Sequence, residues 1–138
     1  MVDLDSEFDR ACSALDESNF ENLSERDRIL VTIWGLEADV NNGGFDQFYF
    51  NSSGNQAFFA PAALEKIGAT LVSAIVREAN SYFGPSGPPS DRDARSSKLE
   101  ELTKGQEDLF DDLDRRFYEY PDDISALLVA YLEANTLS

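Results

Sequence analysis

The sequence predicts an all-α protein that folds as a single domain. Apolar residues recur at intervals of three and four positions through most of the chain, which is the spacing of one face of an α-helix. No run alternates apolar and polar residues in the way that predicts a half-buried strand. The length of 138 residues is enough for one modest hydrophobic core. We therefore expect one compact domain over residues 1–138, built from about seven helices.

Residues 3–18 predict the first helix. Apolar residues follow one another there at steps of four, three, one and three from Leu4 onward, and the aspartates near the start suit the positive end of the helix macrodipole. Ser24, followed three residues later by Asp27, resembles a capping box and marks the start of the second helix. The face of this helix that is expected to be buried contains Ile29, Leu30, Ile33, Trp34 and Val40. Glu37 and Asp39 are expected to stay in water on the other face.

The stretch from residue 41 to residue 54 is the least charged and most aromatic part of the chain. Its residues Phe45, Phe48 and Tyr49 fall at positions i, i+3 and i+4, so they share one face of a helix. The Asn-Gly-Gly sequence before them supplies the φ > 0 freedom that a sharp entry needs. The Asn-Ser-Ser-Gly sequence after them ends the helix with residues that favour caps and turns. We expect a short aromatic central helix that fills the core.

The next segments predict two helices and a loop. Pro61 is expected to open a short helix as its first residue, and Gly68 to end it. Residues 71–83 form a strongly amphipathic stretch that predicts a longer helix. Gly84–Ser90 contains three prolines and two glycines, a composition too poor in backbone donors for a helix, and predicts a mobile surface loop.

The last third of the chain predicts three more helices. Ser90 and the aspartates after it suit a helix start, and Gly105 is expected to separate this helix from the next one. That next helix contains Leu109, Phe110, Leu113 and Phe117. Pro121 and two aspartates then interrupt the chain before a final amphipathic helix, whose apolar residues are Ile124, Leu127, Leu128, Tyr131 and Leu132.

The net charge excludes two classes of partner. The chain has 27 acidic and 11 basic residues, a net charge of −16, and a sequence pI near 4.1. A nucleic-acid-binding protein normally carries the opposite sign, and an anionic membrane surface would repel this chain. We expect no direct nucleic-acid partner and no membrane partner, so a charge-driven partner should be a basic protein. Cys12 is the only cysteine, which excludes an internal disulfide and favours a cytoplasmic location.

The acidic residues concentrate in the two ends of the chain. Residues 91–138 hold 13 acids and 6 bases, whereas residues 41–90 are nearly neutral. We predict a partner-binding acidic face made of Glu100, Glu101, Glu107, Asp108, Asp111, Asp112 and Asp114. Asp108, Asp111 and Asp112 would share one helix face, and such a row of carboxylates can stand in for phosphates against an Arg- and Lys-lined groove. The alternative is the solvated face of an ordinary acidic helix, which keeps the protein soluble.

Little in the sequence indicates catalysis. The chain has no histidine, which removes Ser-His and Cys-His catalysis and imidazole metal sites. Cys12 lies in an apolar stripe and is expected to be inert. No phosphate-binding glycine loop or calcium loop is present, so we expect neither a cofactor nor a metal. The one open alternative is a small-molecule or enzymatic site around Asn42, Asp46 and Gln47; otherwise these polar side chains satisfy backbone groups where helices end.

The central stretch also carries a family resemblance. Its motif residues, with a role in structure or in a pocket, are Asn42, Gly43, Gly44, Phe45, Gln47, Phe48, Asn51, Ser53 and Gly54. This pattern resembles the signature of a bacterial family of unknown function whose best-described member is a dimeric, all-helical DNA mimic. The likeness continues through Ala63–Leu64 and Ile67–Ala69 and returns at Leu113–Tyr118 and Tyr131–Leu132, so it covers roughly residues 25–133.

The resemblance implies a function that composition alone does not. It implies an acidic, non-enzymatic protein that occupies the DNA-binding surface of a transcription factor or nucleoid protein, and a possible homodimer. A second hypothesis is an immunity-type protein that neutralises a basic toxin, since the same charge would serve it. The small-molecule site described above is the third.

Overall fold

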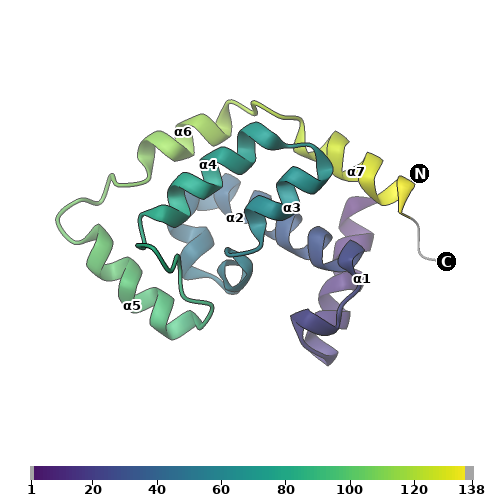
Figure 1. Cartoon of the computed structure of the whole chain (residues 1–138), viewed down its shortest axis with the longest axis horizontal. Coiled ribbons are helices and arrows are strands. Elements are labelled where there is room, and N and C mark those ends of the chain that lie inside the picture. Colours follow the sequence, from purple (N-terminus) through teal and green to yellow (C-terminus); the bar gives the residue numbers. More distant parts are fainter. Residues whose placement is uncertain (1, 136–138) are drawn as a thin grey trace.

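The computed structural model describes residues 2–135 and shows seven α-helices and two 3₁₀ helices in this part of the chain. The elements are α1 (Leu4–Glu17), η1 (Phe20–Asn22), α2 (Glu25–Phe50), η2 (Ser52–Gln56), α3 (Ala60–Ile67), α4 (Thr70–Ser81), α5 (Arg92–Thr103), α6 (Asp111–Tyr118) and α7 (Ile124–Ala134). Figure 1 shows α5 at one end of the molecule and α1 and α7 at the other. The predicted all-α fold is confirmed.

Helix α2 is the central element, and it bends where the sequence predicted a sharp entry. Gly43 and Gly44 have non-helical backbone angles, and φ of Gly44 is 75°, so the helix consists of two arms joined at this kink. The predicted short aromatic helix is the second arm. A residue with a side chain would be strained at this φ, which explains the glycine.

The second arm of α2 fills the core, as expected. Phe45, Phe48 and Tyr49 are fully buried. The Phe45 ring lies 6.0 Å from that of Phe117 in α6, and the Tyr49 ring lies 4.7 Å from that of Phe83, which follows α4. Burying each such side chain stabilises the fold by about 2–3 kcal/mol, so this arm joins α4 and α6 into one core.

The predicted helix starts are confirmed by cap hydrogen bonds. Ser24 accepts the N–H of Asp27 at 3.1 Å, and Asp91 accepts the N–H of Ala94 at 2.9 Å. Helix α4 has a cap from a distant residue, because Asp122 accepts the N–H groups of Leu71 and Val72 at 2.8 and 2.9 Å. This contact ties the segment before α7 to the start of α4. Gly68 ends α3 with φ of 93°, as predicted.

Several expectations for individual residues were wrong. Trp34 was expected on the buried face of the second helix, but it is only half-buried. Glu37 and Asp39 are half-buried and not on a fully wet face. Pro61 is the second residue of α3, which begins at Ala60.

Helix α6 begins later than the spacing predicted. Leu109 and Phe110 lie in the turns before it, and the backbone carbonyl of Asp108 accepts the N–H of Asp111 across one such turn. Phe110 is buried beside Tyr49, with ring centroids 5.5 Å apart, and this contact sets the direction of the chain before the helix starts. Asp108 therefore does not share a helix face with Asp111 and Asp112.

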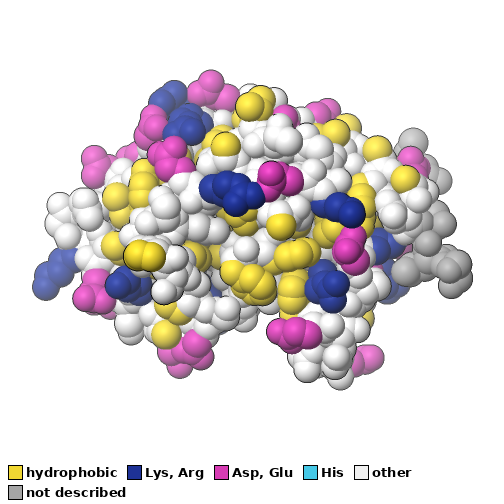
Figure 2. Space-filling model, viewed as in Figure 1, with side chains coloured by type: hydrophobic (Ala, Val, Ile, Leu, Met, Phe, Trp, Pro, Cys, Tyr) yellow, Lys and Arg dark blue, Asp and Glu magenta, His cyan; other side chains and the backbone are white. Residues whose placement is uncertain are grey.

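Charge is distributed unevenly over the surface. Figure 2 shows acidic and basic side chains interspersed on the face that carries α3 and α4. Arg77 of α4 pairs with Glu65 of α3, and Arg116 of α6 pairs with Glu78 of α4. No helix within residues 2–135 is long and apolar enough to cross a membrane.

Candidate interaction surface

The acidic residues between α5 and α6 form the candidate interaction surface. Glu100 and Glu101 lie in the last turn of α5, Glu107 and Asp108 lie in the turns that follow, and Asp111 opens α6. All five side chains are exposed. We call this set the α5–α6 acidic face. It keeps five of the seven residues that were predicted from the sequence.

The backbone beneath this face is held at three points. Arg95 and Leu99 are the buried residues of α5, and Phe110 is buried just before α6. Gly105, with φ of 78°, allows the reversal between the two helices. The aspartates of the first turn of α6 also lie at the positive end of its dipole, where negative charge is favoured.

The acidic face lacks cationic partners of its own. Within residues 2–135, none of its five carboxylates forms an ion pair, although Lys98 and Lys104 are nearby in the sequence. The neighbouring Asp112 differs, because it pairs with Arg115 and Arg116. The hydrogen bond from Arg115 lowers the pKa of Asp112, which keeps the carboxylate ionised, and the two guanidinium groups offset its negative charge.

Asp114 lies under the surface and has a different role from its neighbours. It is half-buried, and its Oδ1 accepts the backbone N–H of Phe45 at 2.8 Å. This N–H lies just after the kink of α2, so Asp114 caps the aromatic arm from another helix. Burial raises the pKa of Asp114, and the charges of Asp46 and Asp111 raise it further.

Helix α6 also explains why the Asn-Gly-Gly stretch and the Leu113–Tyr118 stretch belong to one motif, because the two are in contact. Tyr118, also in α6, donates its hydroxyl to the backbone carbonyl of Val40 at 2.7 Å, so α6 contacts α2 on both sides of the kink. A Cβ on Gly44 would collide with the carboxylate of Asp114. Gly44 and Asp114 therefore form one packing unit.

The polar residues of the central motif bind one another. Asn42 donates to Gln47 at 3.0 Å, and Gln47 and Asn51 both donate to Asp39 Oδ1, at 2.9 and 3.1 Å. This chain of hydrogen bonds spans the kink and links the two arms of α2. These hydrogen bonds support the structural interpretation of Asn42 and Gln47. Asp46 is half-buried, burial raises its pKa, and it forms no side-chain hydrogen bond within the described residues, so the small-molecule alternative around it stays a prediction.

Arg95 is a buried residue whose role the sequence did not indicate. Its guanidinium is fully buried and donates to the backbone carbonyls of Tyr49, Asn51, Pro89 and Ser90, at 2.6, 2.8, 3.1 and 3.1 Å. These hydrogen bonds fasten the end of α2 to the loop before α5. Burial lowers the pKa of Arg95, and the charge of Arg92 adds to this effect. Nothing in the highly charged α5 sequence distinguishes it from its neighbours.

Two further glycines allow this packing. A Cβ on Gly54 would lie 2.6 Å from the carbonyl oxygen of Phe48 and 2.8 Å from Nε of Arg95. A Cβ on Gly35 would lie 2.9 Å from Oγ of Ser53, so η2 crosses α2 at close range there. The Asn-Ser-Ser-Gly part of the motif is thus a backbone support for α5, which carries part of the acidic face.

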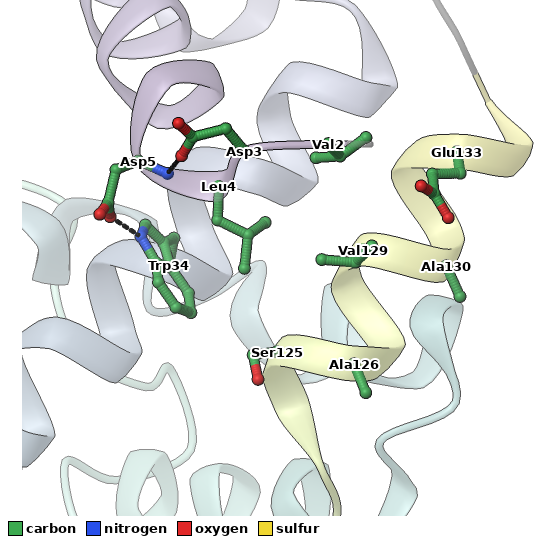
Figure 3. A pocket seen from close by; sticks show the side chains of 10 residues that line it. All are labelled: Val2, Asp3, Leu4, Asp5, Trp34, Ser125, Ala126, Val129, Ala130 and Glu133. Carbon is green, nitrogen blue, oxygen red and sulfur yellow. Dashed lines mark hydrogen bonds between the residues drawn. The ribbon is translucent and has the colours of Figure 1, made fainter.

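A second surface feature is a cleft of about 610 Å³ at the opposite end of the molecule, between α1, α2 and α7. Figure 3 shows Leu4 and Trp34 on one side of it and Val129 on the other. This cleft was not predicted, because the apolar spacing of α2 places Trp34 in the core. The available signal was α7 itself, which has a single charged residue, Glu133, and is apolar on more than its buried side.

Comparison with known proteins identifies a family. Residues 21–135 match the DMP19-like protein family, which is most of the chain, and the chain belongs to that family. No curated protein and no solved structure matches the chain at a significant level.

Proposed function

From this membership of the DMP19-like family, we propose that the protein is a non-enzymatic DNA mimic. It occupies the DNA-binding surface of a basic transcription factor or nucleoid protein. The observation that carries the proposal is the α5–α6 acidic face, with five exposed carboxylates that have no ion-pair partner within the described residues. The net charge of −16 adds a long-range attraction for a basic partner.

The support beneath the acidic face favours a role in recognition. A DNA-binding groove presents Arg and Lys side chains to phosphates at set positions, so a mimic needs carboxylates on a stable backbone. Arg95 anchors α5 to α2, and Phe110 anchors the turn that leads to α6. Carboxylates on such a support lose little conformational freedom on binding, which favours affinity.

The pairing of charge differs between this face and the face that carries α3 and α4. Acids on the face with α3 and α4 are matched by Arg77 and Arg116. The α5–α6 acidic face keeps its charge available for a partner. Exposed acids that only confer solubility would have no need of this anchored support.

The test is capture of DNA-binding proteins by the immobilised protein at low salt, followed by a gel-shift competition with each captured protein and its DNA. We expect the protein to displace DNA from at least one of them, with a strong dependence on salt. A variant with Glu101→Gln, Glu107→Gln, Asp108→Asn and Asp111→Asn should lose this competition.

A matched control separates the acidic face from net charge. The changes Asp9→Asn, Asp16→Asn, Glu17→Gln and Glu21→Gln remove the same charge from exposed positions of α1 and η1. This control should compete nearly as well as the native protein. Unchanged DNA binding by every captured protein would contradict the proposal, and exclusive capture of a basic toxin would support the immunity-type alternative instead.

A further inference from the structure

We infer that the cleft between α1, α2 and α7 is a second binding site, which receives a basic amphipathic helix of a protein partner. The cleft lies at the opposite end of the molecule from α5 (Figure 1), so the inference does not depend on the α5–α6 acidic face. Its walls, its rim and its shape each restrict what can occupy it.

The walls of the cleft are apolar. Leu4 and Trp34 face Val129 across it, and Ala126 and Ala130 add small side chains from α7 (Figure 3). Trp34 is half-buried, and its Nε1 donates to Asp5 at 3.3 Å, which holds the indole against the start of α1. A half-buried tryptophan beside exposed alanines is an apolar surface that a partner can cover.

The rim of the cleft is acidic. Asp3, Asp5 and Glu133 line it, and none of the other described residues that line it is Lys or Arg. An apolar floor with a carboxylate rim is complementary to apolar side chains flanked by Lys or Arg. A cation beside the Trp34 ring would also gain a cation–π contact.

The shape and charge argue against two other occupants. The cleft is wide open, whereas a small ligand needs a site that buries most of its surface. A second copy of the chain, docked by the same cleft, would bring another acidic rim against this one, and like charges in contact oppose association there. A basic helix laid lengthwise in the open groove needs no enclosed site and is attracted by the acidic rim.

Trp34 makes the inference directly measurable, because it is the only tryptophan in the chain. The probe is a synthetic tryptophan-free peptide of about 18 residues, or five helical turns, with leucine at i, i+3, i+4 and i+7 and lysine at most other positions. Its titration at about 0.15 M salt should give a saturable blue shift of the Trp34 emission, as the indole leaves water. A scrambled peptide of the same composition should bind about tenfold more weakly, since it has no continuous apolar side.

Two variants test the wall and the rim separately. The double change Ala126→Gln and Ala130→Gln keeps the charge and alters exposed positions; it should weaken peptide binding about tenfold. The rim change Glu133→Gln should weaken binding roughly threefold. The controls are Leu71→Gln, at an exposed position of α4, and Glu21→Gln, at an exposed position of η1. Both should bind the peptide as the native protein does.

Three results would overturn the inference. The first is equal binding by the native protein and the Ala126/Ala130 variant, and the second is equal binding of the ordered and scrambled peptides. The third is a dimer in sedimentation that the Ala126/Ala130 variant dissociates, which would assign the cleft to a second copy. Circular dichroism and thermal unfolding of each variant show whether a loss of binding is a loss of fold. A failure of peptide binding would not contradict the proposed DNA mimicry, because the test of mimicry depends on variants of the α5–α6 acidic face at the other end of the molecule.

Discussion

At the scale of single residues, Gly54 shows how closely the backbone of η2 is packed. A side chain there would press on the carbonyl of Phe48 and on the Arg95 guanidinium at the same time. We predict that Gly54→Ala lowers the free energy of unfolding by about 1–3 kcal/mol, the usual cost of overpacking. Ser52→Ala, at an exposed position of the same 3₁₀ helix, should change it by less than about 0.5 kcal/mol. Urea unfolding of the two variants checks this, and equal stabilities would disprove the packing argument.

Glu37 is a second residue with a measurable consequence. Its Oε2 is buried without a hydrogen-bond partner within the described residues. Burial raises its pKa above the ordinary value of 4.5, and the charge of Asp123 adds to the effect. The folded state therefore holds this proton more tightly than the unfolded state. Ionisation of Glu37 costs stability progressively as the pH rises from about 4.5 through the raised pKa.

The variant Glu37→Gln cannot ionise at this position. We predict that its stability relative to the native protein increases as the pH rises from about 4.5 through the raised pKa of Glu37, and is constant above that pKa. Thermal unfolding of both proteins across this range measures the difference. A relative stability that is independent of pH, or that falls as the pH rises, would show that burial does not raise the pKa of Glu37.

At the scale of elements, α6 stabilises the kink of α2. Asp114 accepts the Phe45 N–H, and Tyr118 donates to the Val40 carbonyl before the kink. We predict that Asp114→Ala costs about 1–2 kcal/mol through loss of this cap. Asp114→Asn should cost less than half as much, because its side-chain oxygen can still accept the Phe45 N–H.

Hydrogen exchange gives a local measurement of this contact. The Phe45 amide should exchange faster in Asp114→Ala than in Asp114→Asn, because only the alanine variant leaves it without an acceptor. Asp111→Ala, at an exposed neighbouring position, is the control and should leave Phe45 protected. Equal exchange of Phe45 in all three proteins would mean that α6 does not support the kink.

The sequence predicted these elements unequally. The helices and the kink were predictable, because apolar spacing, cap residues and paired glycines are local signals. The late start of α6 was not, since Leu109, Phe110, Leu113 and Phe117 also fit a longer helix, and the contact of Phe110 with Tyr49 decides between the two. Long-range contacts such as Asp122 with α4 leave no local trace.

The candidate sites were predictable only in part, for the same physical reason. The exposed acids of α5 and α6 could be found from charge density. The inward position of Asp114 and the burial of Arg95 depend on partners from α2, far away in the sequence. The cleft beside Trp34 arises where α1 and α7 meet across α2, and single-helix patterns do not contain that arrangement.

At the scale of the whole molecule, uncompensated negative charge should reduce stability. The net charge of −16 is spread over a small domain, and the acids of the α5–α6 face have no ion-pair partners in the described residues. We predict that the melting temperature rises by several degrees between about 0.02 and 0.5 M NaCl, as salt screens this repulsion. The variant with four neutralised acids on this face should show a smaller rise. A melting temperature that falls with salt would indicate that favourable ion pairs dominate instead.

The central claim is that the carboxylates of the α5–α6 acidic face take the place of DNA phosphates. The most direct measurement is the affinity of the protein for a captured regulator from about 0.05 to 0.3 M salt, for the native protein and both fourfold variants. We predict a steep loss of affinity with salt for the native protein and the α1–η1 control, and a weaker, flatter dependence for the variant of the acidic face. The same salt dependence in both variants would contradict the claim, because net charge alone would then account for binding.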